Sequence, residues 1–187
     1  HSYCDANGTS PDLWNAYKDE LHHQLFTKTL RVLRGRPVER DPATLRKVYA
    51  NLEIGDLSIE QIADYLDHFP NRYFAHSGKE EVALHLSMTV RFRQESLEGT
   101  ADPEHLAVVE WRDDLRRSLT IVNVVTKDRP GLFEKVAGAF AITGMNILGA
   151  RAFTRSDEVA IDVFFVEKAE LTIGTNETET RQVFEST

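Results

Sequence analysis

Apolar residues recur at helical spacing through the first half of the chain and form short continuous runs in the second half. Between polar breaks, residues 1–95 place apolar side chains three or four positions apart, which is the pattern of amphipathic helices. Residues 118–166 contain β-branched strands around one helical stretch. The pattern therefore predicts an α+β protein, in which an all-helical segment precedes strands and a helix in the order β, α, β, β.

Helix starts in the first half carry typical capping residues. Four starts are predicted, at Ser10, Asp41, Ser58 and Ser77, the last two as capping boxes with Gln61 and Glu80. The first helix is expected to end at Gly35 and the third before Pro70. One apolar stripe along the first helix consists of Trp14, Tyr17, Leu21, Leu25 and Val32.

The pattern changes after residue 95. Residues 96–117 are turn-rich and are expected to form a linker with one further strand, in "HLAVVEW". Strands are then predicted in "LTIVNVVT", "MNILGARAFT" and "VAIDVFFVE", with a hairpin turn at "RSDE". This order predicts an antiparallel sheet with helices on one face.

The stretch "TKDRPGLF" lies between the first of these strands and the helix. Asp128 suits an N-cap, Pro130 a first helical turn, and Gly131 is unusual because glycine destabilises helices. Unpaired N–H groups and the helix dipole favour an anion there, such as the carboxylate of an amino acid. The alternative is a tight turn whose glycine packs against a neighbouring strand, and the residues alone do not decide between the two.

Composition narrows the function classes. The chain has 22 basic and 30 acidic residues and a net charge of −8, which disfavours nucleic acid and anionic lipid as partners. The single cysteine, Cys4, excludes an intramolecular disulfide and favours a cytosolic location. No apolar run reaches the roughly 18 residues of a membrane span, and no signal peptide is recognisable. Because the first residue is His1, we expect a piece of a longer chain.

Residue chemistry alone predicts no complete active site. Glycines are scattered and form no phosphate-binding loop. The adjacent His22 and His23 point to different sides of a helix and are expected to be surface or structural residues. Asp64 and Asp67 share a helix face but are expected to form a solvated edge.

The run "VVTKDRPGLFEKVAGAFAITGMNILGARAFTRSDEVAIDVFFV" resembles an ACT domain, a ferredoxin-like βαββαβ module that binds amino acids. The upstream runs "YCDANGTSPDLWNAYKDELHHQLF" and "HFPNRYFAHSGKEEVALHL" resemble bifunctional PII-protein uridylyltransferase/uridylyl-removing enzymes. In that family they correspond to the end of an HD phosphohydrolase domain and to the helices that join it to the first ACT domain. The resemblance implies an HD tail and connecting helices over residues 1–95, and an ACT domain over 118–187 that is incomplete at its C-terminus and leaves an unprotected sheet edge.

The resemblance also implies a function. The family attaches UMP to PII signalling proteins and removes it when glutamine is plentiful, so this segment is expected to sense an amino acid, glutamine first, in the cytoplasm. Ligand-binding residues implied by the family's landmarks are Asp128, Arg129, Pro130, Gly131, Leu132, Asn146 and Ile147.

Catalytic residues of the family would all lie upstream, and so would most of the metal site. Mg²⁺ or another divalent metal is expected only for the full enzyme, where Asp5 would be a ligand together with upstream residues. Self-association through ACT domains is also expected. The alternative is a freestanding ACT-type binding or scaffold protein without enzymatic activity.

Overall fold

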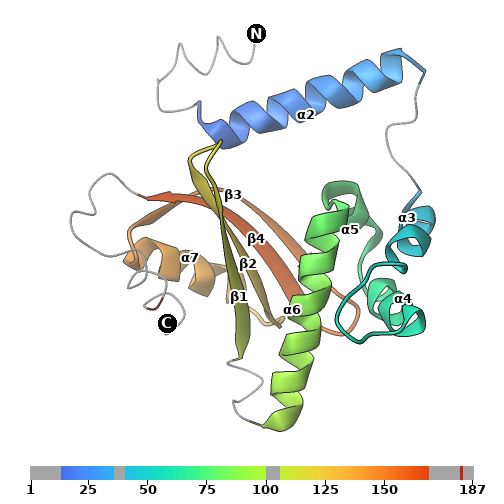
Figure 1. Ribbon diagram of the computed structural model, residues 1–187. Coiled ribbons are helices and arrows are strands. Elements are labelled where there is room, and N and C mark those ends of the chain that lie inside the picture. The colour runs from blue at the N-terminus through green and yellow to red at the C-terminus, as the bar shows by residue number, and fades with distance from the viewer. Residues whose placement is uncertain (1–13, 36–40, 100–105, 169–181, 183–187) are drawn as a thin grey trace.

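The computed structural model describes residues 14–35, 41–99, 106–168 and 182 (Figure 1). Five described helices precede the sheet: α2 (Ala16–Leu33), α3 (Pro42–Tyr49), α4 (Ile59–Asp67), α5 (Asn71–His76) and α6 (Lys79–Glu98). The predicted all-helical first half is therefore confirmed over these ranges. The predicted start at Ser10 lies outside the described residues, and α2 is capped by Asn15, whose side chain accepts the N–H of Lys18.

Two of the predicted helix starts are confirmed. Asp41 caps α3 by accepting the N–H of Thr44, with Pro42 in the first turn. Ser58 and Gln61 form the predicted capping box of α4: the Ser58 N–H donates to the Gln61 side chain at 2.8 Å, and the Gln61 N–H donates to the Ser58 hydroxyl at 3.3 Å.

The capping box predicted at Ser77 is wrong. Ser77 is the C-cap of α5, and α6 begins after Gly78 without a side-chain cap. The N-cap position of α6 is occupied by Gly78, so Ser77 lies one residue too early in the chain to be that cap. Helix α6 ends at Glu98 with Gly99 left-handed at φ 65°, so it extends into the stretch expected to be a linker.

Four strands form one antiparallel sheet in the order β1-β2-β4-β3. Their bounds are Ala107–Asp114 for β1, Leu119–Lys127 for β2, Met145–Thr154 for β3 and Val159–Lys168 for β4. Helix α7 (Leu132–Ile142) connects β2 to β3. The extra strand expected before residue 118 is β1, which pairs with β2 from Ala107↔Thr126 to Asp114↔Leu119. The side of β2 away from β4 is therefore paired, and β1 and β3 are the outer strands of the described sheet.

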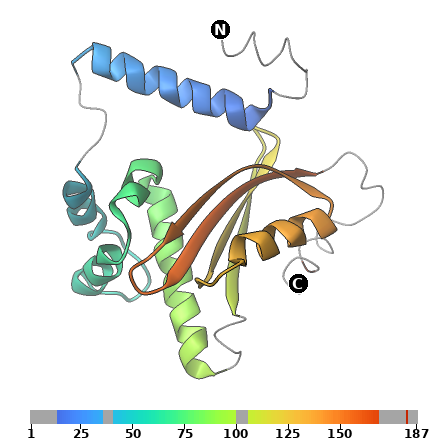
Figure 2. The ribbon, with the colours of Figure 1, turned by 180° about the vertical axis from the view of Figure 1, so that it is seen from behind.

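Within the β, α, β, β unit, helix α7 lies on one face of the sheet as predicted, and the N-terminal helices cover the other face. Figure 2 shows α7 on one side, and Figure 1 shows α6 and α2 on the other. On β2, Val122 and Val124 pack toward α7, whereas Val125 belongs to the core formed with the N-terminal helices. Both faces of β2 are buried, which explains why its sequence is a continuous apolar run and not an alternating one.

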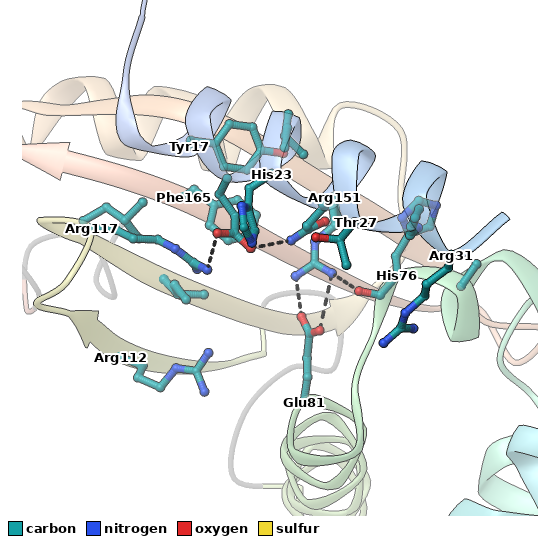
Figure 3. Close-up of a pocket in the computed structure, with 17 residues that line it drawn as sticks. Tyr17, His23, Thr27, Arg31, His76, Glu81, Arg112, Arg117, Arg151 and Phe165 are labelled. Atoms are coloured by element: carbon teal, nitrogen blue, oxygen red, sulfur yellow. Dashed lines mark hydrogen bonds and ion pairs between the residues drawn. The ribbon is translucent and has the colours of Figure 1, made fainter. Parts of the chain in front are cut away.

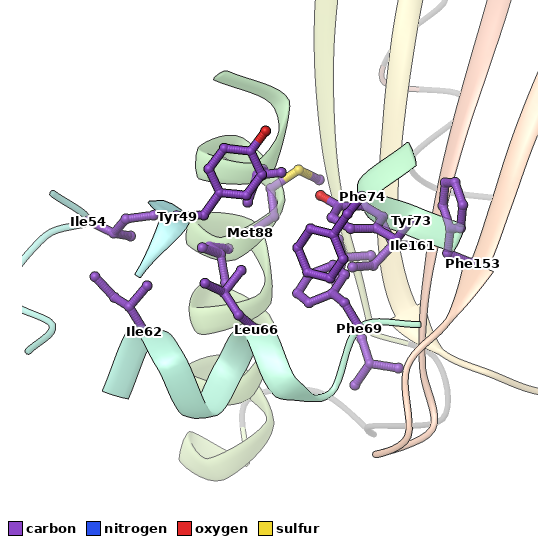
Figure 4. Close-up of a cluster of buried hydrophobic side chains, with 14 of the residues drawn as sticks. Tyr49, Ile54, Ile62, Leu66, Phe69, Tyr73, Phe74, Met88, Phe153 and Ile161 are labelled. Atoms are coloured by element: carbon purple, nitrogen blue, oxygen red, sulfur yellow. The ribbon is translucent and has the colours of Figure 1, made fainter. Parts of the chain in front are cut away.

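The largest buried cluster joins the N-terminal helices to the sheet (Figure 4). Aromatic rings of the α4–α5 segment meet the sheet at Phe153, whose ring lies edge-on to Tyr73 at 5.2 Å between centroids. The predicted hairpin turn at 155–158 also docks here. Arg155 is buried with its guanidinium 4.6 Å from the centroid of Phe69, and the Ser156 N–H donates to the His68 carbonyl at 2.9 Å. The helices and the sheet therefore share one core.

Candidate functional site

The link between β2 and α7 is a tight turn, which the sequence analysis treated as the first turn of the helix. The Leu132 N–H donates to the Arg129 carbonyl at 3.2 Å, with Pro130 and Gly131 at the two central positions. Gly131 has φ 77° and ψ 4°, the values of the third residue of a type II turn, and proline is favoured just before it. The helix begins at Leu132 with Gly131 as its N-cap.

Two local predictions are therefore wrong. Asp128 does not cap the helix, since its side chain accepts the hydroxyl of Thr154 on β3 at 2.8 Å. Pro130 lies in the turn before the helix and not in its first turn. The turn intervenes between Asp128 and α7, and this places the aspartate too far back along the chain to reach the first helical N–H groups.

Gly131 is explained by its backbone. Its left-handed φ is rarely adopted by residues with a side chain. A Cβ at this position would meet nothing within 4 Å, so the glycine does not pack against a neighbouring strand. The packing alternative is therefore wrong, and the start of α7 is open to solvent at this point.

A cavity of about 610 Å³ lies beside the turn. Its walls come from the turn, the first residues of α7, and strands β3 and β4: Asp128, Arg129, Gly131, Leu132, Phe133, Glu134, Ala152, Thr154, Ala160 and Asp162. The first turn of α7 has no side-chain cap, so its amide groups are available to a ligand at the positive end of the helix dipole. The cavity therefore combines helix-terminal donors with carboxylates.

Asp162 is the residue of this cavity that sequence reasoning missed. It is 4% exposed and lies on β4, where Phe164 on the same face packs under α7. Burial, and to a lesser extent the negative charge of Asp128, raises the pKa of Asp162 to about 6. A signal was present in "VAIDVFFVE", because one aspartate inside an otherwise apolar strand is unlike a solvated charge.

The structure brings together part of the residue set implied by the family's landmarks. Asp128, Arg129, Gly131 and Leu132 line the cavity, and Pro130 shapes the turn beside it. Asn146 and Ile147 lie at the start of β3, directly after the C-terminal end of α7. The 11 residues of α7 separate them from Gly131, which corresponds to roughly 16 Å of helical rise. Within one chain, these two residues do not share the cavity.

Asp5, the implied metal ligand, lies outside the described residues. Within the described ranges, no group of three or more His, Cys, Asp or Glu side chains is arranged to hold a metal ion. No helix in those ranges is long and apolar enough to cross a membrane. Asp64 is exposed and Asp67 has a side chain 78% exposed, as expected for a solvated edge.

A four-stranded antiparallel sheet with a crossing helix and a cavity at the helix start defines the class of this domain. Residues 120–184 match the ACT domain family. The N-terminal helices therefore pack against the part of the chain that matches this family.

Most of the chain is also similar to bifunctional uridylyltransferase/uridylyl-removing enzymes. It is 31% identical to the enzyme of Gluconobacter oxydans over 175 residues, which is 89% of this chain and 17% of that protein. It is 32% identical to the enzyme of Rhodospirillum rubrum over 171 residues, again 89% of this chain and 17% of that protein. The Ruegeria pomeroyi enzyme is 29% identical over 176 residues, 89% of this chain and 18% of the relative. The chain thus spans less than a fifth of the length of these relatives.

Proposed function

We propose that this chain is the amino-acid-sensing segment of a uridylyltransferase/uridylyl-removing enzyme, and that its ligand is glutamine. The observation that carries the proposal is the cavity at the start of α7, where the carboxylates of Asp128 and Asp162 lie beside an uncapped helix N-terminus. Domains of the ACT family bind amino acids. The relatives are named for two opposing reactions, uridylyl transfer and uridylyl removal, and such a sensor would regulate the balance between them.

The cavity offers complementary groups to both ends of an amino acid. The ligand's carboxylate would accept the amide N–H groups of the first turn of α7, as anions do at helix N-termini. Its ammonium group would face Asp162 and Asp128, which are acceptors when ionised. Bringing a cation to a buried carboxylate that is costly to ionise offsets the cost of burial. The open space above Gly131 leaves room for the ligand.

Asn146 does not enter this proposal as a ligand residue of the same cavity. It is exposed, with Ile147 next to it, at the opposite end of α7. The two could contact a ligand only when the start of β3 from another ACT domain or another copy of the chain approaches the cavity. Self-association through the ACT domain is therefore part of the proposal.

In the whole enzyme, ligand binding would shift the balance between transfer of UMP to PII and its removal, in the cytoplasm. The route would run through the N-terminal helices, because the hairpin turn beside the cavity is held by them. Thr154 lines the cavity and its hydroxyl donates to Asp128. The next residue in the chain is the buried Arg155. Catalytic residues and any divalent metal would belong to other parts of such an enzyme.

Calorimetric titration of the 187-residue chain with L-glutamine tests the proposal. Binding is expected, and Asp162→Asn is expected to weaken it by about tenfold or more, because a buried charge-assisted hydrogen bond is lost. Asp64→Asn is the matched control, since Asp64 is exposed on α4 and the charge change is the same. D-glutamine and L-glutamate probe the stereochemistry and the side chain of the ligand.

Absence of heat with L-glutamine, together with an unchanged fold by circular dichroism, would contradict glutamine binding within this chain. Equal loss of affinity in Asp162→Asn and Asp64→Asn would contradict the proposed position of the ligand. The alternative of a freestanding ACT-type binding protein has no specific observation in its favour, since the similarity extends into the N-terminal helices.

A further inference from the structure

A second cavity, of about 530 Å³, lies on the opposite face of the sheet from α7, between α2, α6 and the strands (Figure 3). That volume is within the range of small-molecule sites. Five arginine and lysine side chains line it: Lys28, Arg31, Arg112, Arg117 and Arg151. Only two carboxylates do so, Glu20 and Glu81, while His23 and His76 are also present. The lining is thus strongly basic in a chain whose net charge is −8.

The two carboxylates are already engaged. Glu81 pairs with Arg151 at 2.5 Å, and Arg151 also donates to the His76 carbonyl at 2.6 Å. Glu20 pairs with Arg117 at 3.0 Å, and Arg117 is further paired with Asp114 at 3.2 Å. These pairs hold two of the five cationic groups, Arg151 and Arg117, and they involve both of the carboxylates that line the cavity.

Arg31 and Arg112 make no ion pair or side-chain hydrogen bond with any described residue. Figure 3 shows them on either side of the Glu81–Arg151 pair, Arg31 coming from α2 and Arg112 from β1. A cleft lined by one sign of charge concentrates counter-ions, because low-dielectric walls focus the field.

We propose that this cavity binds a small polyanion, with phosphate or carboxylate groups held by the guanidinium groups of Arg31 and Arg112. Guanidinium groups match both chemistries because their planar fork donates two parallel hydrogen bonds. Phosphorylated metabolites and di- or tricarboxylates share this chemistry. Arg151 and Arg117, held in place by their pairs, line the same space and add positive charge.

Occupancy of this cavity has a mechanical consequence. Arg31 belongs to α2 and Arg112 to β1, so one bound polyanion would bridge the N-terminal helix and the sheet. Few other contacts hold the C-terminal half of α2, where Leu25 and Val32 are 63% and 57% exposed. The polyanion would therefore fasten α2 to the sheet. This site is independent of the amino-acid cavity, which lies on the other face.

The test is calorimetric titration of the 187-residue chain with two probes, inorganic pyrophosphate and citrate, at low and high salt. At least one probe is expected to bind, more weakly at high salt because the charged groups are screened. Arg112→Gln and Arg31→Gln are each expected to lower the affinity by about tenfold or more. Arg116→Gln is the matched control: it removes the same charge from an exposed side chain in the β1–β2 turn, outside the cavity.

Hydrogen exchange provides a second readout, because a bridging ligand slows exchange in α2. Binding of pyrophosphate alone assigns the site to phosphorylated molecules, binding of citrate alone assigns it to polycarboxylates, and binding of both assigns it to polyanions of either kind. Binding of neither probe overturns the proposal. So does an equal loss in Arg116→Gln, since it would indicate non-specific attraction.

Discussion

The ring of Tyr17 lies directly on the backbone of Gly149, so closely that a Cβ at position 149 would be 2.3 Å from Cε1 of the ring. The same ring contacts Phe165, with 4.7 Å between the ring centroids. Gly149 also lies at the point where the β3–β4 register shifts. The glycine therefore leaves room for an aromatic side chain that packs the start of α2 against the sheet.

Gly149→Ala is expected to lower the free energy of unfolding by about 1–3 kcal/mol, the usual cost of overpacking. The added methyl group must displace the Tyr17 ring, so hydrogen exchange in α2 should also become faster. Thermal unfolding and exchange mass spectrometry measure the two effects. Gly138→Ala is the control, because a Cβ there meets nothing within 4 Å. That control should stabilise α7 by about 1 kcal/mol.

A buried polar chain joins α5, α6 and β2. The Tyr73 hydroxyl lies 2.8 Å from Nδ1 of His85, and Nε2 of His85 lies 2.9 Å from Oδ1 of Asn123. Because the amide oxygen only accepts, Nε2 carries the proton and Nδ1 accepts from the tyrosine. A neutral imidazole ring thus satisfies both neighbours.

Asn123→Ala is expected to lower the free energy of unfolding by about 1–3 kcal/mol, since it leaves a buried N–H without an acceptor. Ser87→Ala, at an exposed hydroxyl of α6, should change it by less than about 0.5 kcal/mol. Denaturant titration of both variants measures the difference. Equal effects of the two substitutions would show that the buried Tyr73–His85–Asn123 hydrogen bonds make no specific contribution to stability.

The raised pKa of Asp162 should make the stability of the folded protein depend on pH. Its pKa is raised from 3.8 to about 6 in the folded protein, so the folded state binds its proton more tightly than the unfolded state. Its contribution is fully present below pH 3.8 and is lost as the pH rises through about 6. Without ligand, Asp162→Asn should therefore raise stability at neutral pH by about 2–3 kcal/mol, and by little at pH 4. Urea titrations at the two pH values check this; a gain independent of pH would contradict it.

Two substitutions of Gly131 are expected to differ in how much they destabilise the protein. Its left-handed φ of 77° makes any side chain strained, although no neighbour is within 4 Å. Gly131→Ala should cost about 1–2 kcal/mol, and Gly131→Asn less, because asparagine tolerates this conformation better. Thermal unfolding of both variants measures the strain, and equal costs would contradict this explanation.

Local signals in the sequence predicted the helices at Asp41 and Ser58, the strands and the hairpin, because each depends on residues close together in the chain. The helix cap at Asp128 was predicted wrongly, since composition alone did not reveal the type II turn that Pro130 and Gly131 insert before α7. The covering of both sheet faces depends on contacts between distant segments. The basic cavity was not predictable either, because only the fold brings Arg31 and Arg112, which are far apart in the sequence, to the lining of one cavity.

Titration of the Asp162 carboxyl carbon by NMR, with and without L-glutamine, tests the proposed ligand site most directly. In the free protein, the midpoint is expected at about 6, as burial dictates. An ammonium group bound beside Asp162 favours the ionised carboxylate, so saturating L-glutamine should move the midpoint down toward the ordinary aspartate range. A midpoint that stays at its free value under saturating L-glutamine would contradict amino-acid binding in this cavity.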